Sequence, residues 1–124
     1  MSRIVILGGS GFLGRALISE LLKDENNYII NFDQNPKTNL YFQPNPRLDF
    51  FKGNFEEIFS LRTLFEMYNI DTVIHLVSGL LPGSNKEMFI NEMKSVILPT
   101  YSLLDLMAEY KIPKIVYLDR KSVV

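Results

Sequence analysis

A glycine-rich turn near the start of the chain is the first feature whose residue types could do chemistry. Residues 7–14, LGGSGFLG, carry glycines at both the G-x-G-x-x-G and the G-x-x-G-x-x-G spacing. Because glycine has no Cβ, such a turn can be tight and its backbone can approach a phosphate closely, while the start of a following helix attracts the phosphate charge. The turn therefore predicts a pyrophosphate site. The alternative is a glycine-rich connector that binds nothing.

The segments around the turn show which elements would position it. Residues 3–7 are an apolar run typical of a strand buried on both faces, and residues 12–23 have the apolar period of a helix. Further strands are expected at residues 28–32, 48–52, 72–77 and 114–118, and further helices at residues 55–68 and 86–110, the last strained or kinked at Pro99. This alternation predicts an α/β fold: a Rossmann-like, doubly wound parallel sheet of about five strands in the order 3-2-1-4-5.

An acidic residue ends the second expected strand. Asp33 stands 19 residues after Gly14. In a sheet of this order, ligands bind at the carboxyl ends of the strands, and a carboxylate there can accept hydrogen bonds from both hydroxyls of an adenosine ribose. The same carboxylate would repel a 2′-phosphate, so the pattern favours NAD over NADP, although Lys37 could still offer a cation. The alternative for Asp33 is a turn residue that merely ends the strand.

The composition argues against several other classes of function. The chain has 124 residues, of which 47% are hydrophobic and 22% charged, with a net charge of -1, so we expect one domain and no nucleic-acid partner. Its apolar runs are too short for a membrane span, and it has no cysteine, so we expect a cytoplasmic protein without disulfides. The single histidine, His75, lies in an apolar strand and is expected to be structural. No metal site is expected.

Several motifs resemble those of a known family. GGSGFLG is similar to the TGGxGFIG fingerprint of the extended short-chain dehydrogenases/reductases, the NAD-dependent epimerase/dehydratase family that includes UDP-glucose 4-epimerase. Residues 52–55 (KGNF), 70–78 (IDTVIHLVS) and 112–118 (IPKIVYL) resemble further family motifs and follow in the family order. The resemblance implies NAD as cofactor, a nucleotide-sugar substrate and a full-length form that could be a homodimer.

The resemblance also implies contacts residue by residue. Phe12 and Leu13 would offer backbone amides to the pyrophosphate, and Asn54, where the family usually has Asp, would meet the adenine together with Phe55. Residues 76–78 would line the path to the nicotinamide. The expected cofactor-binding residues are Gly8, Gly11, Phe12, Leu13, Gly14, Asp33, Gln34, Asn54, Phe55, Leu76, Val77 and Ser78.

The resemblance further implies a catalytic Tyr-x-x-x-Lys pair on the helix after the fifth strand. Tyr110 and Lys114 have this spacing but precede that strand and straddle Pro113. Tyr117 and Lys121 begin inside it, where four extended positions separate residues by about 13 Å. We therefore expect an N-terminal fragment of an enzyme that lacks its catalytic residues and is itself inactive.

The end of the chain departs from the family. We expect residues 1–118 to be the NAD-binding domain and residues 119–124 (DRKSVV) to be a non-native tail, since one reading frame of a common sequencing-library adapter encodes these six residues. The alternative is a natural small protein with a polar tail. Two other functions stay open. One is a non-enzymatic dinucleotide-sensing regulator on the same fold. The other is an NAD(P)-dependent carbonyl reductase, which would favour a basic residue after the second strand, where Asp33 stands instead.

Overall fold

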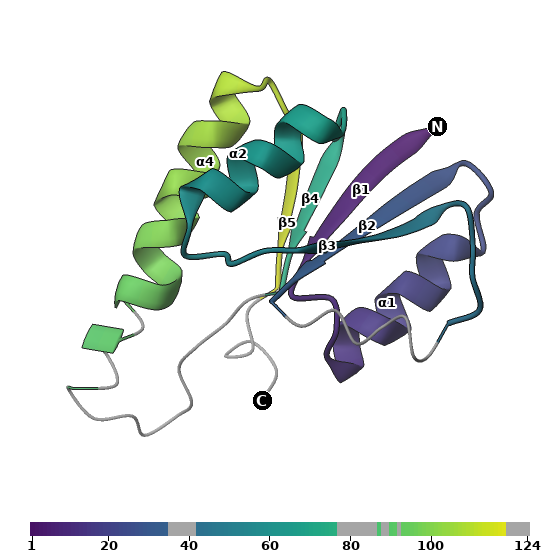
Figure 1. The fold of residues 1–124 in the computed structure, drawn as a ribbon, viewed down its shortest axis with the longest axis horizontal. Helices are drawn as coiled ribbons and strands as arrows, with labels where there is room; N and C mark the ends of the chain where they lie inside the picture. The colour runs from purple at the N-terminus through teal and green to yellow at the C-terminus, as the bar shows by residue number, and fades with distance from the viewer. Residues whose placement is uncertain (35–41, 77–86, 88–89, 92, 119–124) are drawn as a thin grey trace.

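The fold is an open parallel sheet with helices on both faces (Figure 1). A computed structural model describes residues 1–34, 42–76, 87, 90–91 and 93–118. In these ranges five strands pair in the order β3-β2-β1-β4-β5, which confirms the predicted fold class. The strands are β1 (Ser2–Leu7), β2 (Asn27–Asp33), β3 (Leu48–Lys52), β4 (Thr72–His75) and β5 (Lys114–Tyr117), and the helices are α1 (Phe12–Leu22), α2 (Ile58–Met67), the π-helical turn η2 (Met93–Ile97) and α4 (Leu98–Glu109).

The sheet separates two apolar layers. Because successive side chains of a strand point to opposite faces, Val5 and Leu7 of β1 pack with residues of α2 and α4, whereas Ile4 and Ile6 pack with Ile18 of α1. Figure 1 shows the same arrangement, with α1 on one side of the sheet and α2 and α4 on the other. The central strand is therefore apolar along its whole buried length, as its sequence predicted.

The helix expected over residues 86–110 is not one continuous α-helix. A π-helical turn runs from Met93 to Ile97, and a new α-helix begins at Leu98 with Pro99 in its first turn. Proline has no N–H to donate, and its ring crowds the preceding turn of a regular α-helix. The change from a π-helical turn to an α-helix lies directly before this proline.

The register of the strands brings their carboxyl ends level with one another. Leu7 pairs with Phe32 of β2 and with His75 of β4. The residues that follow these three positions therefore lie side by side at one edge of the sheet. They are Gly8, Asp33 and Leu76, all of which the sequence predicted for the cofactor site.

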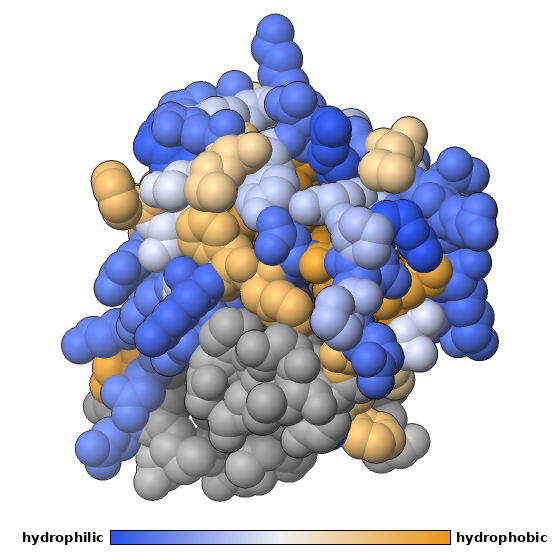
Figure 2. Space-filling model, turned by 45° about the vertical axis from the view of Figure 1, so that its right-hand side comes forward, coloured by the Kyte–Doolittle hydropathy of each residue, from blue (hydrophilic) through white to orange (hydrophobic). Residues whose placement is uncertain are grey.

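Several large apolar side chains are exposed on the described elements. They include Leu98 and Tyr101 on α4 and Ile115, Val116 and Tyr117 on β5, which is an edge strand. Figure 2 shows a face on which hydrophobic residues form a band between hydrophilic ones. Of the helices in the described ranges, none has both the length and the apolar character that a membrane span requires.

Candidate nucleotide-binding site

Three glycines where β1 leads into α1 have three different environments. Gly8 has a φ of 84°, a left-handed conformation that favours glycine, and its N–H donates to the carbonyl oxygen of Phe32 at 2.8 Å. A Cβ at Gly14 would lie 2.5 Å from the backbone of Gly9, so α1 packs directly on the turn. A Cβ at Gly11, in contrast, would have no heavy atom of the described residues within 4 Å. The backbone at Gly11 is therefore accessible to a ligand.

The N-terminus of α1 follows this accessible position. Gly11 is the N-cap, and no side chain of the described residues caps the helix. The first-turn N–H groups of a helix have no partner within it, and the helix dipole adds positive charge there. Phe12 and Leu13 belong to this turn, and their side chains are exposed. Their backbone amides are thus suited to hold a phosphate, which agrees with the roles that the family resemblance implies.

Asp33 connects the turn to the ends of two strands. Its Oδ2 accepts a hydrogen bond from the backbone N–H of Ser10 at 3.1 Å. Its carbonyl oxygen accepts one from the N–H of Gly53, at the end of β3, at 3.1 Å. The carboxylate is therefore half-buried beside the glycine turn rather than extended into solvent.

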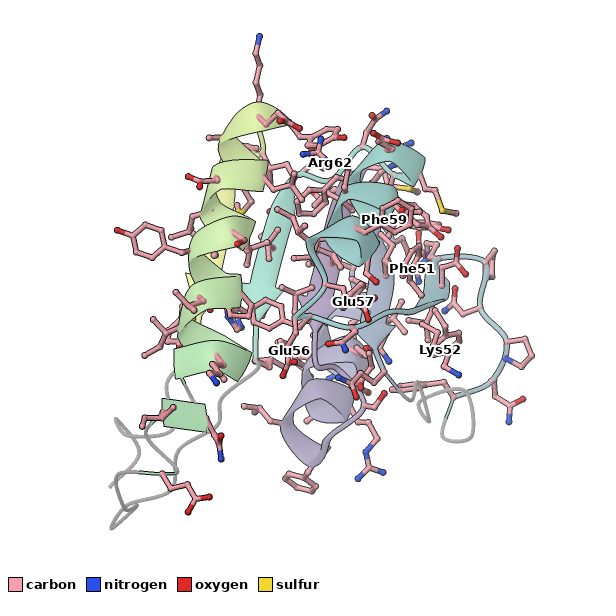
Figure 3. All side chains as sticks on the ribbon, turned by 60° about the vertical axis from the view of Figure 1, so that its left-hand side comes forward. Phe51, Lys52, Glu56, Glu57, Phe59 and Arg62 are labelled. Carbon is pink, nitrogen blue, oxygen red and sulfur yellow. The ribbon has the colours of Figure 1, made fainter. Side chains whose placement is uncertain are left out.

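The side-chain amides of Gln34 and Asn54 form a hydrogen-bonded pair next to Asp33. The Oδ1 of Asn54 accepts hydrogen bonds from the Nε2 of Gln34 at 3.2 Å and from the backbone N–H of Glu56 at 2.9 Å. Lys52, Glu56 and Glu57, labelled in Figure 3, mark this turn between β3 and α2. Asn54 keeps an acceptor oxygen where the family usually has an aspartate. The departure from the family therefore leaves this turn intact.

A cavity of about 260 Å³ lies among these residues. Five of the residues that line it were predicted from the sequence, and two were not. The predicted ones are Gly8, Asp33, Gln34, Phe55 and Leu76; the others are Phe32 and Gly53. The two belong together, because a Cβ at Gly53 would lie 2.5 Å from the ring of Phe32. Their positions next to Asp33 and Asn54 were the signal that could have found them.

The remaining expected residues lie outside the cavity wall. Gly11, Phe12, Leu13 and Gly14 form the start of α1, and Asn54 reaches the site through its hydrogen bond to Gln34. Val77 and Ser78 fall outside the described residues, so their contacts with the cofactor stay a prediction.

His75 is buried below the site. Its Nε2 lies 2.9 Å from the Oγ1 of Thr100, and its ring packs against Phe55 and Tyr117, each with a centroid distance of 4.8 Å. Burial lowers the pKa of His75 to about 4, because water no longer solvates the charged imidazolium. The imidazole is therefore neutral near pH 7 and hydrogen-bonded, the structural role that its apolar strand predicted.

The first Tyr-x-x-x-Lys pair lies away from the cavity. Tyr110 follows the end of α4, at the opposite edge of the sheet, and its hydroxyl donates to the Oε1 of Glu66 at 2.7 Å. That hydrogen bond raises the pKa of Tyr110. Arg62 reaches from α2 toward α4, where it pairs with Glu109 (Figure 3). Tyr110 is thus engaged in joining the two helices.

The second pair is only partly described. Tyr117 lies in β5, where its ring and that of His75 are nearly perpendicular, and Lys121 falls outside the described residues.

Known proteins resemble the chain over nearly its whole length. It is 29% identical over 115 residues to a dTDP-glucose 4,6-dehydratase of Haemophilus influenzae, an alignment that covers 89% of this chain and 34% of the relative. It is 30% identical over 129 residues to a dTDP-D-glucose 4,6-dehydratase of Dictyostelium discoideum, covering 99% of this chain and 30% of the relative. The chain thus spans about a third of the length of these relatives.

Solved structures share the fold. A UDP-glucose 4-epimerase from Bifidobacterium longum, in complex with NAD⁺ and UDP, superposes with a TM-score of 0.79 at 22% identity. The superposition covers 94% of this chain and 36% of the epimerase chain. A dTDP-glucose 4,6-dehydratase from Bacillus anthracis in complex with NAD gives a TM-score of 0.77 at 23% identity, with coverage of 94% and 37%. The family described as NAD dependent epimerase/dehydratase matches residues 4–122. On this match, the chain belongs to the NAD-dependent epimerase/dehydratase family.

Proposed function

We propose that this chain is the NAD-binding part of an epimerase or dehydratase that acts on a nucleoside-diphosphate sugar. The observation that carries the proposal is the half-buried Asp33 carboxylate, which lines a cavity beside an accessible glycine turn and a helix N-terminus. This donor and acceptor set suits a dinucleotide: amides for the pyrophosphate and a carboxylate for a ribose diol. NAD, when bound, would supply a hydride acceptor for the sugar.

Each part of the site has a proposed role. The amides of Phe12 and Leu13 would hold the pyrophosphate, for which the missing Cβ of Gly11 leaves room. Asp33 would accept hydrogen bonds from the adenosine ribose. Phe55 and Asn54 would flank the adenine, and Leu76 to Ser78 would lead toward the nicotinamide.

Sugar binding and proton transfer would belong to the rest of a longer protein. The relatives are about three times as long as this chain, and the hydroxyl of Tyr110 is bound to Glu66 at the edge opposite the cavity. The 124-residue chain should therefore bind the cofactor without turning over a sugar.

Titration of the chain with NAD and with NADP tests the proposal. NAD should bind more tightly, because a 2′-phosphate would meet the Asp33 carboxylate. Asp33→Ala should weaken NAD binding by about 1–3 kcal/mol, the scale of losing a charged hydrogen-bond partner. Asp105→Ala, which removes an exposed carboxylate on α4, is the matched control and should leave NAD binding unchanged. Equal affinity of the unaltered chain for NADP would refute the ribose role of Asp33 and favour a carbonyl reductase.

A further inference from the structure

A buried amide lies behind the glycine turn. Asn31 has no exposed surface, although it is polar and stands between the apolar residues Ile30 and Phe32 of β2. Its Nδ2 donates to the Oγ of Ser10 at 3.2 Å, and a Cβ at Gly9 would lie only 2.4 Å from its Oδ1. Burying an amide is costly unless it is hydrogen-bonded. The buried amide of Asn31 therefore depends on its contacts with Ser10 and Gly9 of the turn.

Two residues of β2 hold Ser10 from the same side. Asn31 and Asp33 are two positions apart, so their side chains point to one face of the sheet. Asn31 contacts the hydroxyl of Ser10, and the Asp33 carboxylate accepts the backbone N–H of the same residue at 3.1 Å. Ser10 is thus attached at its side chain and at its backbone, and it connects the buried amide to the carboxylate of the site.

We propose that Asn31 is a positioning residue: through Ser10 it holds the Asp33 carboxylate in the orientation that distinguishes NAD from NADP. The inference rests on the proposed function above. With Ser10 fixed, its N–H fixes one carboxylate oxygen of Asp33, and because the group is planar the orientation of the other follows. A carboxylate held in place can accept from two neighbouring ribose hydroxyls and keeps its charge where a 2′-phosphate would lie. Without Asn31, the Ser10 N–H would move and the carboxylate could turn aside.

The ratio of the NAD and NADP affinities tests this inference. Ser10→Ala removes the hydroxyl that Asn31 contacts but keeps the backbone N–H that Asp33 accepts. It should lower NAD affinity about threefold to tenfold, the effect of one net hydrogen bond, and change NADP affinity less, so that the preference for NAD narrows. Ser10→Thr keeps the hydroxyl and is the matched control, which should retain the preference.

A double-mutant cycle with Asn31→Leu tests whether Asn31 and Ser10 act through the same contact. If both residues act through one contact, Asn31→Leu should narrow the preference for NAD over NADP when Ser10 is present. The same substitution should narrow that preference little further in the Ser10→Ala variant. Hydrogen exchange without ligand gives a second measurement: the Ser10 amide should exchange faster in Asn31→Leu, since its support is lost. If Asn31→Leu does not fold, Ser10→Ala against Ser10→Thr decides the question alone.

The outcomes separate this inference from the proposed function. An unaltered chain that binds no NAD would refute the proposed function itself. An unaltered chain that prefers NAD, with Ser10→Ala lowering both affinities equally or neither, would overturn only the positioning role. Equal losses would mean that Asn31 and Ser10 stabilise the turn without affecting which cofactor is chosen.

Discussion

At the scale of single residues, the glycines of one turn serve two separate needs. Gly14 is required by packing, because a Cβ there would collide with the backbone of Gly9. Gly11 is not required by packing, because its Cβ direction is clear of the described residues and its φ of -78° suits any residue. On the proposed role of Gly11, fold stability and cofactor binding should therefore be separable within four residues.

A pair of substitutions checks this separation. Gly14→Ala should lower the free energy of unfolding by about 1–3 kcal/mol, the range for an overpacked site. Gly11→Val should change it by less than about 0.5 kcal/mol, as surface substitutions do, yet abolish NAD binding by filling the space beside the helix N-terminus. Urea unfolding and NAD titration measure the two effects. A folded Gly11→Val chain with unchanged NAD affinity would show that the phosphate site is elsewhere.

His75 gives a prediction of pH dependence. Its pKa is about 4 in the folded chain, against about 6.5 in an unfolded one. The unfolded state therefore binds a proton first, so the stability contributed by neutral His75 is present above pH 6.5 and is lost as the pH falls toward 4. The loss should total about 3 kcal/mol. His75→Gln cannot titrate, so urea unfolding between pH 7 and pH 4 should show a shallower decline for this variant; parallel curves would contradict the burial effect.

At the scale of elements, two clusters of side chains at the strand ends opposite the cavity join α2 to the sheet and to α4. Tyr28 and Tyr68 both donate to the Oδ2 of Asp49, which connects β2 and β3 to the end of α2. Burial is the main cause that raises the pKa of both tyrosines, and both hydroxyls are protonated donors near pH 7. Arg62 and Tyr110 then connect α2 with α4. The clusters at the amino-terminal ends of the strands thus hold the elements together, while the candidate site lies at the carboxyl ends.

The edge strand β5 predicts self-association. All four of its residues are exposed, and Ile115, Val116 and Tyr117 are large and apolar. Unpaired strand edges of this kind promote pairing between chains. Light scattering should therefore increase with concentration, and Val116→Lys should reduce the increase by adding charge at the edge. Thr63→Lys on α2 adds the same charge elsewhere and should have little effect; equal suppression by both variants would point to net charge instead of the edge.

At the scale of the whole molecule, the described residues supply the proposed cofactor site, and neither Tyr110 nor Tyr117 lines its cavity. We predict no epimerase or dehydratase turnover when residues 1–124 are assayed with NAD and nucleotide sugars. The hydroxyl of Tyr110 is bound to Glu66 at the strand ends opposite the cavity, and the ring of the half-exposed Tyr117 contacts His75. Measurable turnover that disappears in Tyr110→Phe or Tyr117→Phe would contradict this prediction and identify the base.

Local patterns in the sequence predicted the fold and most of the residues that line the cavity. The alternation of apolar strands with helical periods predicted the strand order, and the glycine spacing and the acid that ends β2 predicted the turn and the place of Asp33. Strand and helix periods depend on backbone geometry alone, so they can be recognised without the tertiary structure.

Contacts between distant residues were decided only by the tertiary structure. Within the run YIINF, Asn31 has no feature that indicates its role, because its partner Ser10 is 21 residues away and becomes a neighbour only when β1 and β2 pair. Phe32 and Gly53 line the cavity for the same reason, since β2 must lie beside β3. The sequence shows which residues could bind a dinucleotide, whereas strand pairing decides which buried side chains lie next to them.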